Sequence, residues 1–139
     1  MKTDIRSLVF TKRLFKELYN IDITWNIDEF SRADGYFTFN GKEYIIECKA
    51  RRFPSSKYKT TIINRDKFEY LSRNNSILVI IFQDGMYIFK DIKKAVVRDS
   101  LKYGRTTTDF GGYYRYSLKT ELDLNKAIKV DVDTSFVYV

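Results

Sequence analysis

The chain of 139 residues contains no histidine, one cysteine and one proline. The absence of histidine excludes Ser-His-Asp and Cys-His nucleophilic systems, imidazole general bases and histidine-ligated zinc. The single cysteine, Cys48, excludes an internal disulfide and a cysteine-rich metal cluster. A metal ion in this protein would therefore sit on carboxylates, which favour hard cations such as Mg²⁺ or Mn²⁺.

Long apolar runs are also missing. Charged side chains interrupt the apolar positions of the first 20 residues, so this segment lacks the apolar core of a secretory signal. No segment approaches the run of about 18 apolar residues that a membrane span needs. We therefore expect an intracellular, cytoplasmic protein.

What the chain has in quantity is apolar surface and positive charge. Hydrophobic residues make up 44% of the chain, and 25 Lys and Arg against 18 Asp and Glu leave a net charge of +7. This apolar content predicts a folded protein, and the length suits one domain over residues 1–139. The excess of positive charge favours a polyanionic partner, although a uniformly basic surface would give the same total.

Periodicity and turn signals predict an α/β sheet domain. In an amphipathic helix over 4–19, the face expected to be buried carries Ile5, Leu8, Val9, Phe15, Leu18 and Tyr19, with Lys12 as its one polar residue. The other predicted elements are a strand over 21–25, a hairpin of strands 34–39 and 43–49, a helix from about 62 to 74, a hairpin of strands 76–82 and 86–90, a short helix within 91–103, and strands over 113–118 and 136–139.

The turn at Asn40-Gly41 determines which residues of the first hairpin face one another. With this turn the numbers of paired residues sum to about 81, which sets Asp34 opposite Glu47. Side chains of a strand alternate between its faces, so Glu47 and Lys49 lie on the same face. The sequence therefore predicts two carboxylates from neighbouring strands beside one ammonium group.

Two carboxylates this close repel one another unless a cation lies between them. A divalent ion held by Asp34 and Glu47 meets that need, and the backbone carbonyl of Cys48 would add a third oxygen. Such an ion polarises a phosphoryl oxygen and lowers the pKa of a bound water, while Lys49 would neutralise developing charge. The pattern thus favours phosphodiester hydrolysis, although charges on an antiparallel strand are more often ordinary solvent-facing residues.

Asp34, a spacer of twelve residues and Glu47-Cys48-Lys49 together resemble the PD-(D/E)XK nuclease superfamily. Over about residues 1–90 the chain is most similar to small archaeal-type Holliday junction resolvases and related phage nucleases. These place a basic residue two positions after the lysine, here Arg51. The resemblance implies a restriction-endonuclease-like core, with a central mixed β-sheet that contains an antiparallel meander and is flanked by helices.

The resemblance also implies a role for each residue of the motif. Asp34 and Glu47 would be metal ligands, and Lys49 the catalytic lysine, of an enzyme that uses Mg²⁺ or Mn²⁺. Ala33 occupies the position where the name of the superfamily has proline. The resolvases also resemble one another in a glutamate of the first helix, for which Glu17 is a candidate as a third metal-binding carboxylate. The alternative for Glu17 is a surface ion pair.

Basic residues surround the motif. No acid lies between Glu47 and Asp66, and this stretch would contact the DNA phosphates on either side of the scissile bond. The alternative is a solvated basic loop. The candidate nucleic-acid-binding residues are Ser31, which resembles a loop serine of the resolvases, and Arg32, Arg51, Arg52, Lys57 and Lys59.

The expected function is metal-dependent hydrolysis of DNA phosphodiesters by an endonuclease. The resemblance implies branched DNA as the substrate, as in Holliday junction resolution during recombination, and a homodimer that makes two cuts. The alternatives are a general repair, restriction or phage DNA-processing nuclease, which would extend the expected location to a phage-infected host, a catalytically inactive nucleic-acid-binding relative, and a basic protein without a nucleic-acid partner.

Aromatic and basic residues are interleaved over residues 103–116: Tyr103, Arg105, Phe110, Tyr113, Tyr114, Arg115 and Tyr116. This mixture is typical of surfaces that stack on unpaired nucleobases. Tyrosine also suits strands and protein interfaces, and of the two interpretations we favour this second one.

Overall fold

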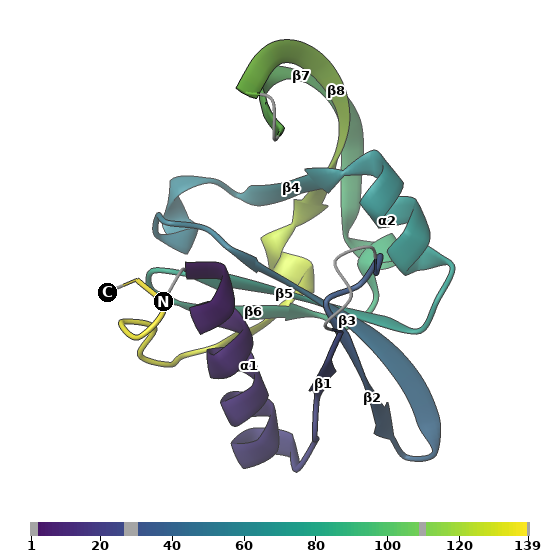
Figure 1. Cartoon of the computed structure of the whole chain (residues 1–139), viewed down its shortest axis with the longest axis vertical. Coiled ribbons are helices and arrows are strands. Elements are labelled where there is room, and N and C mark those ends of the chain that lie inside the picture. The colour runs from purple at the N-terminus through teal and green to yellow at the C-terminus, as the bar shows by residue number, and fades with distance from the viewer. Residues whose placement is uncertain (1–2, 27–30, 109–110, 139) are drawn as a thin grey trace.

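The chain folds into two β-sheets and two α-helices in a computed structural model, which describes residues 3–26, 31–108 and 111–138 (Figure 1). The helices are α1 (Thr3–Tyr19) and α2 (Arg65–Ser72). The strands are β1 (Thr24–Trp25), β2 (Gly35–Phe39), β3 (Lys42–Ala50), β4 (Thr60–Asn64), β5 (Ser76–Phe82), β6 (Gly85–Phe89), β7 (Val96–Thr108), β8 (Gly111–Asp123) and β9 (Ile128–Val130).

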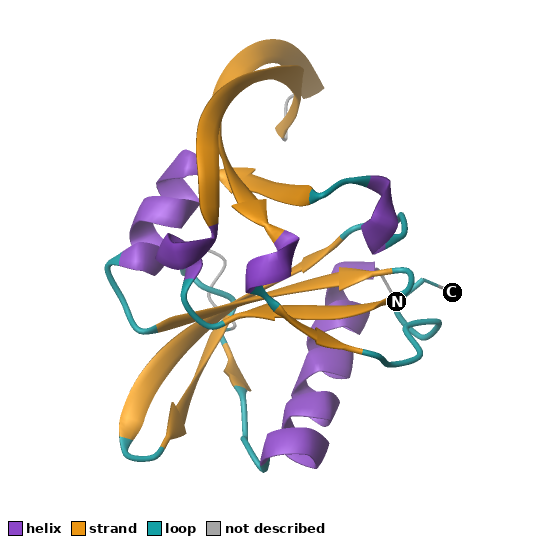
Figure 2. Cartoon of the chain, turned by 180° about the vertical axis from the view of Figure 1, so that it is seen from behind, coloured by secondary structure: helices purple, strands orange, loops and turns teal. Residues whose placement is uncertain are grey.

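The central sheet has six strands in the order β1-β2-β3-β5-β6-β9, and the second sheet has three in the order β4-β8-β7. Strand β3 pairs antiparallel with β2 and parallel with β5, so the central sheet is mixed, as expected. Helix α1 lies on one side of this sheet, whereas α2 and the second sheet lie on the other (Figures 1 and 2). Strand β5 is buried along its whole length because both of its faces are covered.

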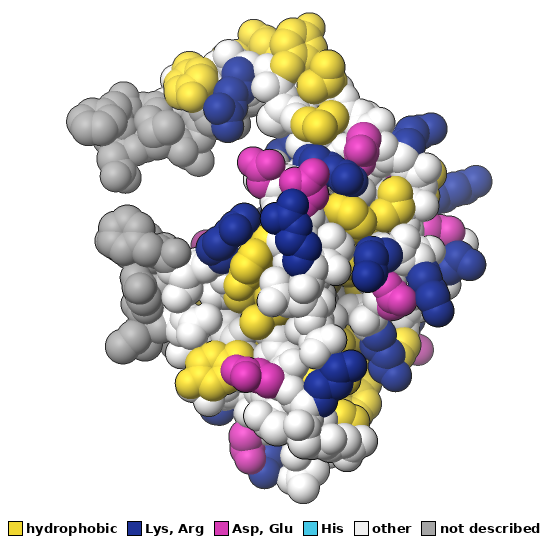
Figure 3. All heavy atoms as spheres, turned by 90° about the vertical axis from the view of Figure 1, so that its right-hand side faces the viewer, with side chains coloured by type: hydrophobic (Ala, Val, Ile, Leu, Met, Phe, Trp, Pro, Cys, Tyr) yellow, Lys and Arg dark blue, Asp and Glu magenta, His cyan; other side chains and the backbone are white. Residues whose placement is uncertain are grey.

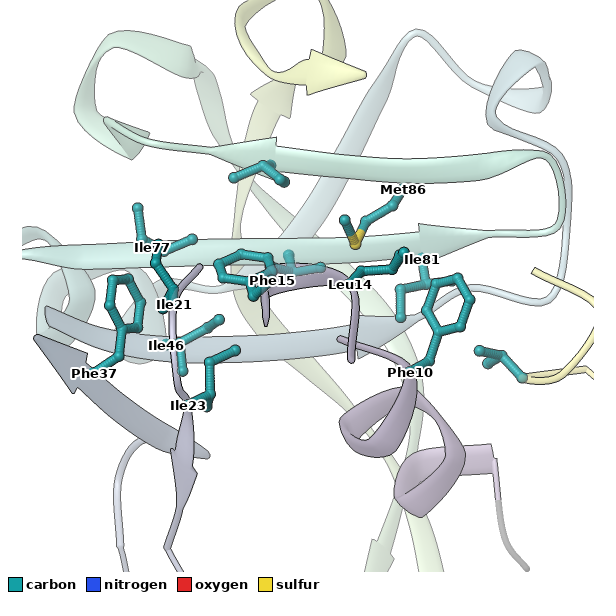
Figure 4. Packing of buried hydrophobic residues seen from close by; sticks show 13 residues of the cluster. Phe10, Leu14, Phe15, Ile21, Ile23, Phe37, Ile46, Ile77, Ile81 and Met86 are labelled. Carbon is teal, nitrogen blue, oxygen red and sulfur yellow. The ribbon is translucent and has the colours of Figure 1, made fainter. Parts of the chain in front are cut away.

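Two apolar clusters fill the spaces on either side of the central sheet. In the first cluster, Phe10, Leu14 and Phe15 of α1 pack on the sheet, which contributes Ile46 from β3 (Figure 4). The second cluster joins α2 and the second sheet to the opposite face of β5. Alternate residues of β3 and β5 therefore belong to different clusters, and the chemistry of the two faces is separate.

Helix α1 has the expected bounds but buries a different face. Ser7 and Thr11 are buried together with Phe10, Leu14 and Phe15. Four residues expected to be buried are exposed: Ile5, Val9, Leu18 and Tyr19. Both faces follow helical spacing, and the small side chains of Ser7 and Thr11 allow the helix backbone to approach the sheet closely.

The first hairpin has the register that its turn predicts. Gly35 pairs with Ile46 and Tyr36 with Ile45. Asn40 and Gly41 both have positive φ, at 53° and 74°, as a two-residue hairpin turn requires. The second predicted hairpin is also confirmed, because β5 and β6 pair antiparallel around the turn before Gly85.

The helix expected from residue 62 begins only at Arg65. Ile62 and Ile63 instead belong to strand β4, which pairs antiparallel with β8. The run of β-branched residues from Thr60 to Ile63 suits a strand better than a helix. The spacing of Phe68 and Leu71 thus predicted the helix correctly, whereas Ile62 and Ile63, which were assigned to the same helix, belong to β4.

The C-terminal third departs most from expectation. The short helix expected within 91–103 is reduced to a 3₁₀ helix at Ile92–Ala95, and β7 follows it directly. The strand expected over 113–118 is an inner part of the longer β8. Residues 135–138 form turns where a strand was expected, and residue 139 lies outside the described residues. In the described part of the chain, no helix is long and apolar enough to cross a membrane.

Candidate active site

Asp34 and Glu47 meet at the edge where β2 gives way to a loop. Asp34 directly precedes β2, and the pairing of Gly35 with Ile46 brings it alongside Glu47 on β3. An oxygen of Asp34, Oδ2, accepts a hydrogen bond of 2.8 Å from the backbone N–H of Cys48. The backbone carbonyl of Asp34 accepts a second bond of 2.8 Å, from the N–H of Asn26. The Asp34 carboxylate is therefore fixed against β3 at the point expected from the turn.

The backbone of Cys48 contributes to this edge of the site. Its N–H points to the edge of β3 that β2 covers only as far as Gly35. Beyond that point the Asp34 carboxylate accepts the hydrogen bond that a neighbouring strand would otherwise accept. The N–H and C=O of one residue in an antiparallel ladder point to the same neighbour, so the carbonyl of Cys48 faces this side as well. Its thiol points to the other face of the sheet, where Sγ lies 3.6 Å from Oγ1 of Thr11.

Two lysines flank the carboxylate of Glu47. Its Oε1 lies 3.5 Å from Nζ of Lys49, two residues along the same face of β3. Its Oε2 lies 3.4 Å from Nζ of Lys67, which belongs to α2 and also donates a hydrogen bond to the backbone carbonyl of Arg32. Glu47 is only 4% exposed, whereas the side chain of Lys49 is 38% exposed. Lys49 can therefore reach a substrate from solvent, while Glu47 is held inside.

The electrostatic balance at Glu47 favours an additional cation. Burial raises the pKa of the Glu47 carboxyl, and the negative charge of Asp34 raises it further. Lys67 and Lys49 lower this pKa but do not cancel the other two effects. The two ammonium groups thus do not fully stabilise the negative charges of Asp34 and Glu47. A divalent cation between the two carboxylates would favour the ionised form of Glu47.

The donor atoms suit Mg²⁺ or Mn²⁺. The carboxylates of Asp34 and Glu47 and the carbonyl of Cys48 are oxygen donors, and Mg²⁺ is commonly held by one or two carboxylates together with water and substrate phosphate. Among the residues that the structure describes, no three or more Asp, Glu, Cys or His side chains gather as a metal-binding group. The fit therefore rests on two carboxylates and a backbone oxygen.

Glu17 is not brought to this site. It is exposed on α1, which packs on the face of the sheet that carries Ile46 and Cys48. Glu47 alternates to the other face of β3, toward α2. The third carboxylate considered from the sequence therefore lies on the wrong side of the central sheet for a shared ion.

A groove of about 760 Å³ opens beside Lys49, between β3 and the second sheet. Its charged lining residues are Lys49, Arg51, Arg98, Lys102, Lys119 and Glu121. Burial and the neighbouring positive charges, Arg51 first among them, lower the pKa of Lys119. Five basic side chains against one acid give this groove the charge that a phosphate backbone requires.

A second groove, of about 550 Å³, lies on the α2 side of the site. Four basic side chains, Lys67, Arg32, Arg65 and Arg115, and two acids, Asp66 and Glu69, line it. The guanidinium of Arg32 lies 4.4 Å from the centre of the Tyr70 ring. The two grooves share Asn64 and reach Glu47 from different sides, through Lys49 in one and Lys67 in the other.

The predicted DNA-binding residues occupy different environments. Arg51 is partly buried, and Nη2 of its guanidinium donates a hydrogen bond of 3.1 Å to the carbonyl of Ile62. Its backbone N–H bonds to the carbonyl of Ile81 and the hydroxyl of Tyr138. Arg51 thus joins β4 to the central sheet as well as lining the groove. Ser31, Arg32, Arg52, Lys57 and Lys59 are exposed.

Sequence reasoning did not identify Lys67 as a neighbour of Glu47. The two residues are 20 positions apart and on different elements, and no local pattern joins them. Lys67 does share a helix face with Tyr70, away from buried Phe68 and Leu71. Arg98, Lys102 and Lys119 of β7 and β8 were also missed, because their position beside Lys49 depends on the pairing of β8 with β4 across a long separation.

Comparison with known proteins identifies the fold. No protein-family model and no curated protein matches the chain. Among solved structures, it is similar to Hjc, a Holliday junction resolvase of the hyperthermophilic archaeon Archaeoglobus fulgidus, with a TM-score of 0.52 and 12% sequence identity. The match covers 94% of this chain and 95% of the other, and so extends well beyond the first 90 residues. The chain therefore shares the fold of this resolvase, the restriction-endonuclease-like fold that was expected from the sequence.

Proposed function

We propose that this protein is a divalent-metal-dependent endonuclease that hydrolyses DNA phosphodiesters, with branched DNA such as a Holliday junction as its substrate. The observation that carries the proposal is the meeting of Asp34 and Glu47 beside two lysines, Lys49 and Lys67, each of which lines a separate groove. The fold shared with a resolvase supports the same conclusion. Because such an enzyme needs access to host or phage DNA, a cytoplasmic location is part of the proposal.

Each residue of the site has a defined part in this proposal. A bound Mg²⁺ or Mn²⁺ would supply Lewis-acid polarisation of the phosphoryl group. Asp34, Glu47 and the carbonyl of Cys48 would hold the ion. Lys49, the more exposed of the two lysines, approaches the phosphoryl oxygens and stabilises their developing charge. Lys67 acts through Glu47, which it orients, and is a positioning residue.

The arrangement of the grooves supports a branched substrate. One groove approaches Glu47 through Lys49 and the other through Lys67. A junction presents backbones that diverge from one point, which suits two grooves whose lysines both contact one carboxylate. A dimer would bring two such sites to opposed strands, and its presence is part of the proposal.

The test is cleavage of labelled DNA by the full chain. Linear, nicked and four-way-junction substrates of the same sequence are incubated with Mg²⁺, with Mn²⁺ or with EDTA. We expect cutting with either metal, preference for the junction, and no cutting in EDTA. Cutting that persists in EDTA would refute the proposed mechanism. Binding without cutting under every condition would instead identify a catalytically inactive relative, and sedimentation of the same samples tests the dimer.

A matched pair of variants assigns the site. Glu47→Gln removes a carboxylate from the site, whereas Glu43→Gln makes the same change at an exposed position on the same strand. We expect the first variant to bind the junction without cutting it and the second to cut like the wild type. Metal-dependent cutting by Glu47→Gln would show that the site has been assigned to the wrong residues.

A further inference from the structure

Strands β7 and β8 continue beyond the second sheet as a two-stranded arm. Strand β4 covers β8 only from Lys119 onward, so the residues from 111 to 118 pair with β7 alone. The arm extends away from the central sheet and curves over at the top of the molecule (Figure 1). A two-stranded ribbon contributes little stability by itself. Its surface residues therefore need an explanation other than packing.

Large side chains line one face of the arm. The register pairs Leu101 with Leu118 and Tyr103 with Tyr116. Tyr114 is two residues before Tyr116 in β8 and therefore lies on the same face. We call these five residues the tyrosine face. Their exposed fractions run from 46% to 68%, and hydrophobic side chains are visible on the arm in Figure 3. These tyrosines lie in strands, as the interpretation favoured from the sequence expects, and their side chains are largely exposed.

The tyrosine rings are arranged as an open platform. The ring centroids of Tyr103 and Tyr114 lie 5.5 Å apart with nearly parallel planes, and those of Tyr103 and Tyr116 lie 5.0 Å apart. Tyr103 and Tyr114 stack on one another, Tyr116 is tilted against Tyr103, and all three rings are more than 60% exposed, so outer faces and edges remain open to a flat partner. Nucleobases are such partners, and stacking on tyrosine is tolerant of sequence.

The charge of the arm favours a polyanion over a second copy of the chain. Lys102 and Arg115 lie on the described part of the arm, on the face opposite the tyrosines, and Lys119 follows at its base, where β4 begins to pair with β8. Lys102 is paired with Glu121, and no acid lies in the described part of the arm between Asp99 and Glu121. Contact between two arms would bring like charges together, whereas a nucleic-acid backbone would neutralise them. Exposed aromatic rings next to basic side chains are typical of a surface that binds single strands.

The arm is continuous with the candidate active site. On one face it contributes Lys102 and Lys119 to the groove that Lys49 lines. On the tyrosine face it contributes Tyr116 and Leu118 to the groove that Lys67 lines. A nucleic-acid strand held at Asp34 and Glu47 would therefore meet the arm whether it followed the groove of Lys49 or the groove of Lys67.

We propose that the tyrosine face stacks on unpaired bases of the nucleic-acid strand whose backbone passes the Asp34–Glu47 site. The inference rests on the proposed function and deepens it, because it assigns the selection of unpaired over paired DNA to the arm. Bases inside a duplex are already stacked and cannot use the platform, whereas bases exposed at a branch or in a single strand can.

The test compares two triple variants in EDTA, where cleavage does not interfere. In one variant Tyr103, Tyr114 and Tyr116 are replaced by Val, which keeps the preference for strand structure, and in the other by Phe, which keeps the aromatic rings. Fluorescence anisotropy measures binding to a single strand of about 20 nucleotides, a duplex of the same length and a four-way junction. Thermal unfolding verifies that both variants fold.

We expect the Val variant to lose roughly tenfold to hundredfold in affinity for the single strand and to retain its affinity for the duplex. The slope of affinity against salt should stay unchanged, since no charge is removed. The Phe variant should bind like the wild type. In the wild type, photo-crosslinking to a strand that carries 5-iodouracil should label the tyrosine face.

Three results would overturn the proposal. The Val variant could bind the single strand as tightly as the wild type, or it could lose equal affinity for single strand and duplex. It could also sediment as a smaller particle than the wild type, which would show that the tyrosines hold two copies of the chain together. The two proposals fail separately. If the Val variant binds normally while the wild type cuts junctions, the stacking surface is refuted and the endonuclease stands. If binding depends on the tyrosines but no metal-dependent cutting occurs, the stacking surface stands and the endonuclease is refuted.

Discussion

Glu47 of the central sheet and Glu121 of the second sheet have similar surroundings and different chemistry. Each is only 4% exposed, and each forms ion pairs with two basic side chains. The partners of Glu47 are Lys49 and Lys67, and those of Glu121 are Arg98 and Lys102. Glu47 also has the carboxylate of Asp34 beside it, whereas Glu121 has the hydroxyl of Ser100.

The comparison separates a structural ion cluster from a candidate metal site. A buried carboxylate with cations on both sides has its charge balanced by the protein, as at Glu121. A second carboxylate upsets that balance, and at Glu47 it contributes to a raised pKa. The pairing of acids, more than burial or the presence of lysines, therefore distinguishes the site that would hold a divalent ion.

The largest expected difference between the two glutamates is in cleavage. Glu47→Gln should lower the single-turnover rate of junction cleavage by about a thousandfold or more, because it removes a proposed metal ligand. Glu121→Gln should stay within about tenfold of the wild type, because Glu121 only balances charge in the groove. Rates measured over a Mg²⁺ titration test this. Equal losses in both variants would mean that the two glutamates do not differ in role.

The pH dependence of metal binding gives the next largest effect. Protons compete with the metal for Glu47, whose raised pKa brings this competition closer to neutral pH. Mn²⁺ affinity should fall as the pH falls through that pKa, by about tenfold per pH unit below it. Titration calorimetry at several pH values measures the effect. The Glu121→Gln variant should show the same profile, and a changed profile would indicate coupling between the two sites.

Removal of one lysine should have a smaller effect. Lys67→Met takes away a charge that lowers the pKa of Glu47, so the acidic limb of the cleavage profile should move to higher pH. Lys119→Met is the matched control, because Lys119 lines the groove beside Lys49 and contacts Asn64. It should leave the profile in place and flatten the salt dependence of DNA binding by about one ion. An unmoved profile in Lys67→Met would exclude a positioning role.

The smallest expected effects are on the stability of the metal-free protein, and they have opposite signs. Relative to the unfolded chain, Glu47 has a raised pKa, so its contribution to stability is greatest at low pH and is lost as the pH rises through the folded-state pKa. At neutral pH Glu47→Gln should therefore raise the melting temperature by a few degrees, equivalent to about 1 kcal/mol.

Glu121→Gln should lower the melting temperature by a similar amount, about 1 kcal/mol, because it leaves Arg98 and Lys102 without their partner. The loss is modest because both basic side chains are well exposed, at 69% and 47%. Thermal unfolding in EDTA over a range of pH measures both variants. A melting temperature for Glu47→Gln below that of the wild type would refute the electrostatic account of the site.

Local signals predicted the elements that lie close together in the sequence. The Asn40-Gly41 turn gave the register of β2 and β3, and with it the meeting of Asp34 and Glu47. Alternation along β3 correctly placed Glu47 and Lys49 on one face. Both inferences needed only a tight turn and the period of a strand, which are properties of a few consecutive residues.

Local sequence patterns gave wrong predictions where two structures were compatible with the same apolar spacing. Helix α1 has two apolar stripes, and contact with the sheet selected the one that contains Ser7 and Thr11. Residues from Val96 onward form a strand because β8 lies beside them, although a short helix was compatible with their apolar spacing. The choice in each case was made by packing against residues far away in the chain.

The amino-acid sequence by itself determined that two acids and a lysine would converge, because a hairpin turn transmits register directly to its strands. Only the tertiary structure decided that Lys67 meets Glu47, that Glu17 lies across the sheet from it, and that the tyrosines of the arm face solvent. These relations depend on how helices and a second sheet dock on the central one. Docking is governed by the total burial of apolar surface, which no short segment of the chain encodes.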